Sequence, residues 1–234
     1  MPRLGVARAL RARVLVGVVL WLGVGGLGAG AVGLAEGAAA QAGVLVSRVL
    51  TLEETEAFAR RVDYEGMDEV EASRIGAEGV ARLVEMLGDS DEKPHHARIL
   101  LALGISGGEG AFEAISQWAE RQPAEGELDR SEFRAWQTFP FALGKLAHRD
   151  PRVLSRLAAC FDAEAPAWTF RHFKGARLQT LERRAAVVAL AETGTPEALR
   201  VLDAVERRAS DPALAAHVRA VRAQASGRPA GTAR

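Results

Sequence analysis

The sequence predicts an all-α protein, an α-solenoid of stacked helical hairpins. From Thr51 onward, no segment alternates polar and apolar residues over β-branched positions, as a half-buried strand does. Similar Ala-Leu segments recur around Leu103, Leu143 and Leu190, which lie 40 and then 47 residues apart. This interval fits a repeat of two helices. Because one hairpin cannot bury its apolar face alone, such repeats stack on their neighbours.

The N-terminal segment, residues 1–42, is predicted to be a secretory signal peptide. Four arginines precede an uncharged apolar run, and small residues follow it, which is the order of regions in such signals. The A-x-A pattern ends at Ala40, so cleavage is expected before Gln41 or after Ala42. The alternative is an uncleaved anchor, because the uncharged residues 14–34 are long enough to span a bilayer. In both cases the arginines stay inside, so the body is periplasmic or secreted, or is anchored in the inner membrane and faces outward.

The body, residues 43–225, is expected to be helical, and residues 226–234 to form a disordered tail. Its first helix starts at Thr51, where Thr-Leu-Glu-Glu predicts a capping box between Thr51 and Glu54. Apolar residues then recur at helical spacing in successive segments. The expected helices span about 51–62, 77–87, 94–103, 110–121, 131–146, 151–161, 178–192, 196–205 and 212–225.

Glycine, proline and hydroxyl residues mark the ends of these helices. Gly104 and Gly194 are each expected to close a helix, because glycine readily adopts the left-handed conformation found after helix ends. Ser131 is the expected cap of a helix between them. Thr195 and Pro196 open a later helix, since proline is tolerated in the first turn.

Small residues are expected where the two helices of a pair cross closely. They recur at matching places in the three copies, next to the leucines that define the repeat. The residues concerned are Ala102, Gly104, Ala142, Gly144, Ala189 and Ala191.

The segments from His95 to Ile115 (HHARILLALGISGGEGAFEAI) and from Leu181 to Val205 (LERRAAVVALAETGTPEALRVLDAV) resemble a known family. They are similar to the HEAT-like repeat of phycobilisome-lyase-type proteins, and the resemblance covers roughly residues 77–225. It implies a HEAT/armadillo-like α-solenoid and says little about activity. The middle copy departs from the pattern, because Pro140 lies inside its first helix, which we expect it to kink. A long insertion, residues 162–177, follows its second helix.

Charge and composition narrow the class of partner. The 234 residues include 30 basic and 30 acidic ones, so no net charge attracts the chain to nucleic acid. We therefore expect no nucleic-acid partner. We expect a membrane to be a partner only if the N-terminal segment is not cleaved.

No segment has the pattern of a catalytic, metal or cofactor site. His95 and His96 are adjacent and would point about 100° apart on a helix, so both are expected in a solvated first turn. Cys160 is the single cysteine and is expected to be buried and inert. The glycine-rich turn GISGGEG lacks the strand and the Lys-Ser or Lys-Thr of a phosphate-binding loop.

The insertion carries the most distinctive composition of the chain. Its segment PAWTFRHFKGAR combines aromatic residues such as Trp168 and Phe170 with basic ones such as Arg171 and Lys174. One interpretation is a binding loop with aromatic anchors and a basic rim. The other, which we favour, is a lid that folds back over the irregular middle repeat, because exposed aromatic clusters are uncommon.

These observations predict a non-catalytic, extracytoplasmic helical-repeat scaffold that binds a protein or peptide along its second helices. Two alternatives stay open. The resemblance to lyase-type proteins implies an enzyme or a chromophore-handling protein, and an uncleaved N-terminal segment implies a membrane-tethered structural subunit. The candidate partner-binding residues are Trp168, Phe170, Arg171, Lys174, Arg152, Arg156 and Arg200.

Overall fold

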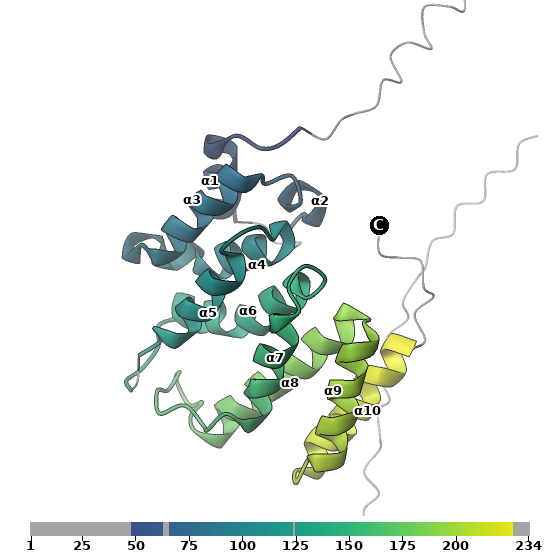
Figure 1. Cartoon of the computed structure of the whole chain (residues 1–234). Helices are drawn as coiled ribbons and strands as arrows, with labels where there is room; N and C mark the ends of the chain where they lie inside the picture. The colour runs from purple at the N-terminus through teal and green to yellow at the C-terminus, as the bar shows by residue number, and fades with distance from the viewer. Residues whose placement is uncertain (1–47, 63–65, 124, 227–234) are drawn as a thin grey trace, which may run out of the picture. The chain divides into compact units, whose positions relative to one another are not determined.

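The protein is mostly helical. A computed structural model describes residues 48–62, 66–123 and 125–226; the predicted signal peptide, and the predicted tail apart from its first residue, lie outside these ranges. The described residues form no strand, so the prediction of an all-α fold is confirmed (Figure 1). The helices are α1 (Leu52–Arg60), α2 (Glu69–Ala72), α3 (Ala77–Gly88), the 3-10 helix η2 (Ser90–His95), α4 (His96–Ser106), α5 (Ala111–Glu120), α6 (Arg130–Leu146), α7 (Arg152–Asp162), α8 (Ala176–Thr193), α9 (Pro196–Arg208) and α10 (Pro212–Ser226).

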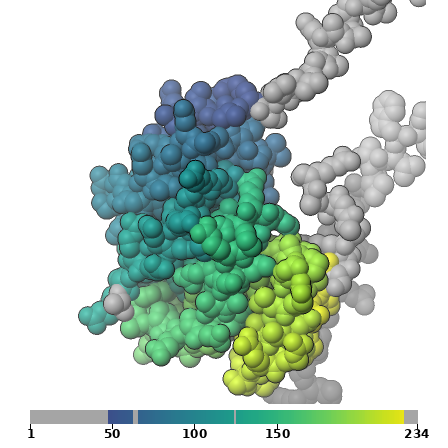
Figure 2. All heavy atoms as spheres, viewed as in Figure 1, coloured from purple at the N-terminus to yellow at the C-terminus, as the bar shows by residue number. Residues whose placement is uncertain are grey.

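The helices of the body form two layers. In the first layer, α4 packs on α6, α6 on α8, and α8 on α10. In the second layer, α5 contacts α4 and α6, α7 contacts α6 and α8, and α9 contacts α8 and α10. Each segment therefore packs mainly on its neighbours in the sequence, and the colours run in order across the surface in Figure 2.

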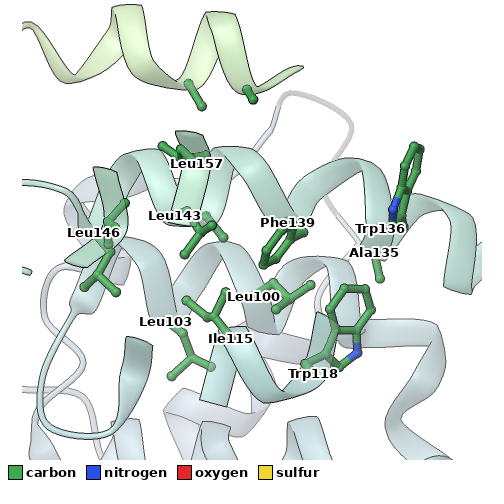
Figure 3. Close-up of a cluster of buried hydrophobic side chains, with 14 of the residues drawn as sticks. Leu100, Leu103, Ile115, Trp118, Ala135, Trp136, Phe139, Leu143, Leu146 and Leu157 are labelled. Carbon is green, nitrogen blue, oxygen red and sulfur yellow. The ribbon is translucent and has the colours of Figure 1, made fainter. Parts of the chain in front are cut away.

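Much of the core lies between consecutive helices of the first layer. Figure 3 shows Phe139 and Leu143 on the side of α6 that faces Leu100 and Leu103 of α4. All four of these side chains are at most 2% exposed. Trp136, one turn earlier on α6, points to the opposite side of that helix in the same view. The middle helix α6 thus buries two faces, one against α4 and one toward α8.

Several predicted helix ends are confirmed. The Thr51–Glu54 capping box is present, with the Glu54 N–H donating to Thr51 Oγ1 at 3.2 Å and the Thr51 N–H donating to Glu54 Oε2 at 2.9 Å. Gly194 follows α8 in the left-handed conformation, with φ at 64°. Thr195 caps α9, and Pro196 is its first residue.

The predictions for Gly104 and Ser131 are wrong. Gly104 lies within α4, which continues to Ser106, and Gly107 takes the positive φ of 64° instead. Gly104 does not end the helix. Its missing side chain is needed for the packing of α6 on α4. The cap of α6 is Asp129, whose carboxylate accepts from the Ser131 and Glu132 N–H groups while Glu132 reaches back to complete a capping box. This carboxylate reaches the first turn of α6 from one residue before the helix.

The small residues do make close contacts, but between different helices from those predicted. A Cβ at Gly104 would lie 2.3 Å from the carbonyl oxygen of Ala142 on α6. A Cβ at Gly144 would lie 3.1 Å from the Cβ of Ala189 on α8. The close crossings therefore join consecutive first helices, and not the two helices of a hairpin.

Two further differences concern the second helices and α6. On α9, the apolar side chain of Leu199 is 36% exposed, and the neighbouring Ala198 takes the buried position. The helix α6 continues through Pro140 to Leu146, and the expected kink stays a prediction. Proline has no N–H, so residue 140 gives no hydrogen bond to the carbonyl of Trp136 one turn earlier.

Candidate functional site

The insertion folds back on α6 as a lid. Trp168 is 5% exposed, and its ring meets that of Trp136 edge-on, with centroids 4.9 Å apart. Phe170 is stacked on Phe133, with centroids 3.9 Å apart. The backbone is also tied down, because Thr169 exchanges hydrogen bonds of 2.8 Å with the 126–128 segment. These contacts match the lid interpretation, with Trp168 placed inside the core.

The basic residues of the lid remain on its surface. Arg171 is exposed and has a positive φ of 51°, and its guanidinium lies 5.4 Å from the centre of the Phe170 ring. Arg177, in the first turn of α8, lies 4.5 Å from the centre of the Phe173 ring. Lys174 is exposed. The lid therefore buries Trp168, partly buries Phe170 and Phe173, and presents its cations to solvent.

The candidate arginines of the second helices are held by neighbouring groups. Arg152 pairs with Glu113 of α5 and with Asp150, each at 2.6 Å. These hydrogen bonds hold the pKa values of both carboxyls below their usual range. Arg200 pairs with Glu197 at 2.5 Å in the same helix.

Arg156 packs differently from the other two. Its guanidinium lies 5.1 Å from the centre of the buried Phe139 ring, so much of this side chain covers the core.

The seven predicted residues do not form one surface. Trp168, Phe170, Arg171 and Lys174 belong to the lid, which begins after α7 ends at Asp162. Arg152 is at the other end of α7, about 15 Å from Asp162 at the rise of an α-helix. The structure thus groups the lid residues together and separates them from Arg152, and Arg200 lies on another helix, α9.

A pocket that the sequence did not predict lies on the first layer, between α6, α8 and α10. Its volume is about 260 Å³. Pro140 and Phe141 line it from α6, and Leu181 and Val188 from α8. Trp136, which supports the lid, contributes to the same wall. The lining is mainly apolar, as in sites that take one large side chain or a small molecule.

Polar groups stand around this apolar lining. Gln137 from α6 and Arg184 from α8 are both exposed, and His217 reaches the pocket from α10. The Nε2 atom of His217 is buried and has no hydrogen-bond partner among the described residues. Glu182 is the acidic residue of the lining, and burial raises its pKa while the positive charges of Arg156 and Arg183 oppose that rise.

The most reactive type of side chain in this body, the cysteine thiol, is used for packing. Cys160 is 1% exposed, and burial raises the pKa of its thiol to about 12, so it carries no thiolate at neutral pH. The expectation of a buried cysteine is confirmed.

His96 is also buried, at 9% exposure, which corrects its predicted place in a solvated turn. Trp118 donates its indole N–H to His96 Nδ1 at 3.1 Å, and the other ring nitrogen lies 3.2 Å from the Asp89 carbonyl oxygen. Burial lowers the pKa of His96, which favours the neutral imidazole. Helix α4 begins at His96, two residues later than predicted, and the 3-10 helix η2 precedes it.

Among the described residues, no three histidine, cysteine or acidic side chains gather as metal ligands would. None of the described helices has both the length and the apolar character needed to cross a bilayer. Comparisons with protein-family models, curated proteins and solved structures gave no match.

One sequence signal for the pocket was present. Helix α8 buries Ala186, Val187 and Leu190, yet Leu181 and Val188 add apolar positions on a second side of the same helix. A helix that is apolar on more than one side has more than one partner surface. The hairpin pattern accounts for only one of these sides, and the other side faces the pocket.

Proposed function

We propose that this chain is a non-catalytic, exported scaffold of the HEAT-like helical-repeat class that binds a protein or peptide partner. The observation that carries the proposal is the apolar pocket between α6, α8 and α10, with polar groups on its rim. The row of first helices, each stacked on the next, supports the repeat architecture. Such a row is a stiff platform, because each helix is held on both sides by its neighbours.

The binding surface in this proposal is the first layer, and not the second helices that the sequence favoured. On the second helices, Arg152 and Arg200 already have acidic partners within the chain. A partner protein that used these arginines would have to replace existing ion pairs. On the first layer, Arg184 has no ion pair within the described structure, and the apolar lining beside it is open to a ligand.

The non-catalytic part of the proposal is supported by the state of the reactive groups. A neutral, buried His96 with both ring nitrogens in contact with protein groups is suited to packing. A thiol with a pKa of about 12 is a poor nucleophile near neutral pH. Packing in the core accounts for the burial of both side chains.

The test compares recovery of a partner by the wild-type protein and by two single variants. Val188→Asp places a charge in the pocket, and Ser155→Asp places the same charge on the exposed side of α7. Each protein, expressed from the full sequence, is immobilised and exposed to an envelope fraction of its host, and the partner is identified and then purified for a direct binding measurement. We expect Val188→Asp to lose the partner and Ser155→Asp to keep it.

If the partner is lost with Ser155→Asp and kept with Val188→Asp, the binding site is on the second helices and not on the first layer. Circular dichroism of both variants checks that the helical fold is intact. N-terminal sequencing of the same preparations is expected to begin at Gln41 or Gly43, and a chain that keeps its N-terminal segment would remove the cleaved signal from the proposal.

A further inference from the structure

The chemistry of the partner follows from the residues that surround the pocket, and this inference rests on the proposed function. On α8, Arg177, Leu181, Arg184 and Val188 are four, three and four residues apart, so they lie along one side of the helix. Leu181, Arg184 and Val188 line the pocket. Arg177 continues the same side by one turn toward the lid. The pocket is therefore the apolar end of a strip that carries positive charge.

The lid adds more cations to the other end of this strip. Phe170 and Phe173 both lie against Phe133 of α6, with ring centroids 3.9 and 6.2 Å away. Arg171 is placed over the Phe170 ring and Arg177 over the Phe173 ring. Two guanidinium groups are thus fixed around one aromatic cluster at the start of α6. This fixed placement reduces the entropy that each side chain loses when it meets a ligand.

Helix α6 also carries an exposed cation, Arg134, but this residue lines a separate groove on the α4 side together with Thr138 and Leu101. In the described part of the chain, Arg134, Arg171, Arg177 and Arg184 form no ion pair, in contrast to Arg152 and Arg200. The nearby acid Glu127 accepts a hydrogen bond of 3.1 Å from the Arg171 backbone N–H. The acid of the pocket, Glu182, faces the positive charges of Arg156 and Arg183.

We propose that this strip, from Arg171 and Arg177 to the pocket at Val188, binds an acidic segment of a partner protein that carries one large apolar side chain. The apolar side chain enters the pocket against Phe141 and Val188. The carboxylates lie against Arg177 and Arg184, and those farther along the segment lie against Arg171. The apolar contact supplies most of the affinity, and the unpaired cations select the sign of charge and speed the encounter.

The experiment measures binding of short fluorescent peptides by anisotropy, with the protein expressed from its full sequence. The first peptide places one phenylalanine among glutamates and aspartates. The second replaces that phenylalanine by alanine, and the third replaces every acid by lysine. We expect the first to bind, the second to bind about ten- to a hundredfold more weakly because a buried aromatic is lost, and the third not to bind.

Protein variants locate the site of this binding. Arg177→Ala and Arg184→Ala are each expected to weaken the first peptide about two- to fivefold, as exposed charge pairs do. Arg207→Ala removes an equally exposed arginine from α9 and is expected to change nothing. Added salt is expected to reduce these differences, because exposed charges are screened. An equal effect of all three variants would overturn the placement on this strip.

The remaining outcomes separate this inference from the proposed function. The inference about the partner's charge is wrong if the lysine peptide binds as well as the acidic one, or if the binding of neither peptide depends on Arg184. The proposed function still holds in that case if Val188→Asp abolishes recovery of the partner. If vesicles of anionic phospholipid bind through Arg177 and Arg184 and the acidic peptide does not, the occupant is a membrane and the inference is overturned. Concentration-dependent dimerisation abolished by Val188→Asp would assign the pocket to a second copy and overturn it as well.

Discussion

In the first layer, the backbones of α4 and α6 nearly touch at Gly104, and α6 and α8 approach closely at Gly144. In the second layer, α5 and α7 are bridged by charged side chains, Arg152 and Glu113, which are about half exposed. The first arrangement gains from close packing, which depends on shape. The second gains little, because exposed ion pairs are screened by water and salt. Close backbone packing is therefore found within the first layer, while the second layer contributes buried side chains such as Ile115 and Leu157.

The same contrast bears on binding. A layer whose backbones are locked together holds its surface side chains at fixed distances. The pocket and its neighbouring arginines are on this rigid layer. Charged groups of the second layer are paired within the chain, as Arg152 is with Glu113 of the neighbouring helix and Asp203 of α9 is with Arg222 of α10 at 2.5 Å. Such pairs leave fewer free charges for a partner.

The largest expected effect comes from removing the lid from the first layer. The double substitution Trp168→Ala and Phe170→Ala is expected to lower the free energy of unfolding by about 5 kcal/mol, because a buried indole and a stacked phenyl ring are both lost. Urea unfolding measures the loss. Phe170→Ala alone is expected to cost less, since that ring is only partly buried. The matched control is Val70→Ala, because Val70 is 66% exposed; an unchanged midpoint in the double variant would contradict the lid.

The second expected effect tests the close crossing itself. Gly104→Ala is expected to destabilise by about 3 kcal/mol, because the new Cβ would meet the backbone of α6 and force the helices apart. Gly88→Ala adds the same methyl group at the end of α3, where nothing lies within 4 Å. That control is expected to be neutral or slightly stabilising, since alanine favours helix over glycine by about 1 kcal/mol. Similar unfolding midpoints for the two variants would show that the first layer tolerates expansion.

The sequence predicted the helices well, because their signals are local. Thr51 and Glu54 cap α1 from within one turn, and Thr195 with Pro196 opens α9 in the same way. Gly104 was misassigned because a glycine required by a neighbouring helix and a glycine required by a helix end look alike in sequence. Only the position of Ala142, 38 residues later, distinguishes the two roles.

The candidate site was harder to predict for a related physical reason. Trp168 and Arg171 belong to one distinctive segment, and its composition alone marks it as a candidate site. The pocket, in contrast, combines Phe141, Val188 and His217, which are far apart in the chain and ordinary in their local context. Such a site exists only through the stacking of three helices. The arginine pairs of the second helices were equally hidden, because they depend on which helices face each other.

The smallest expected effect is in the second layer. Arg152→Ala is expected to lower the urea midpoint at neutral pH only slightly, since the Arg152 side chain is 56% exposed and that of Glu113 is 46% exposed. The sign of any residual effect is fixed. Arg152 lowers the pKa values of Glu113 and Asp150 in the folded state. The folded protein therefore binds protons less readily than the unfolded chain in the acidic range. This contribution is complete above the ordinary carboxyl pKa of about 4 and is lost as the pH falls through the lowered values.

Urea midpoints of Arg152→Ala and wild type should thus converge on acidification, with Arg207→Ala matching wild type throughout. A loss at neutral pH as large as that of Gly104→Ala would mean that charge pairs, and not only close packing, hold this fold together.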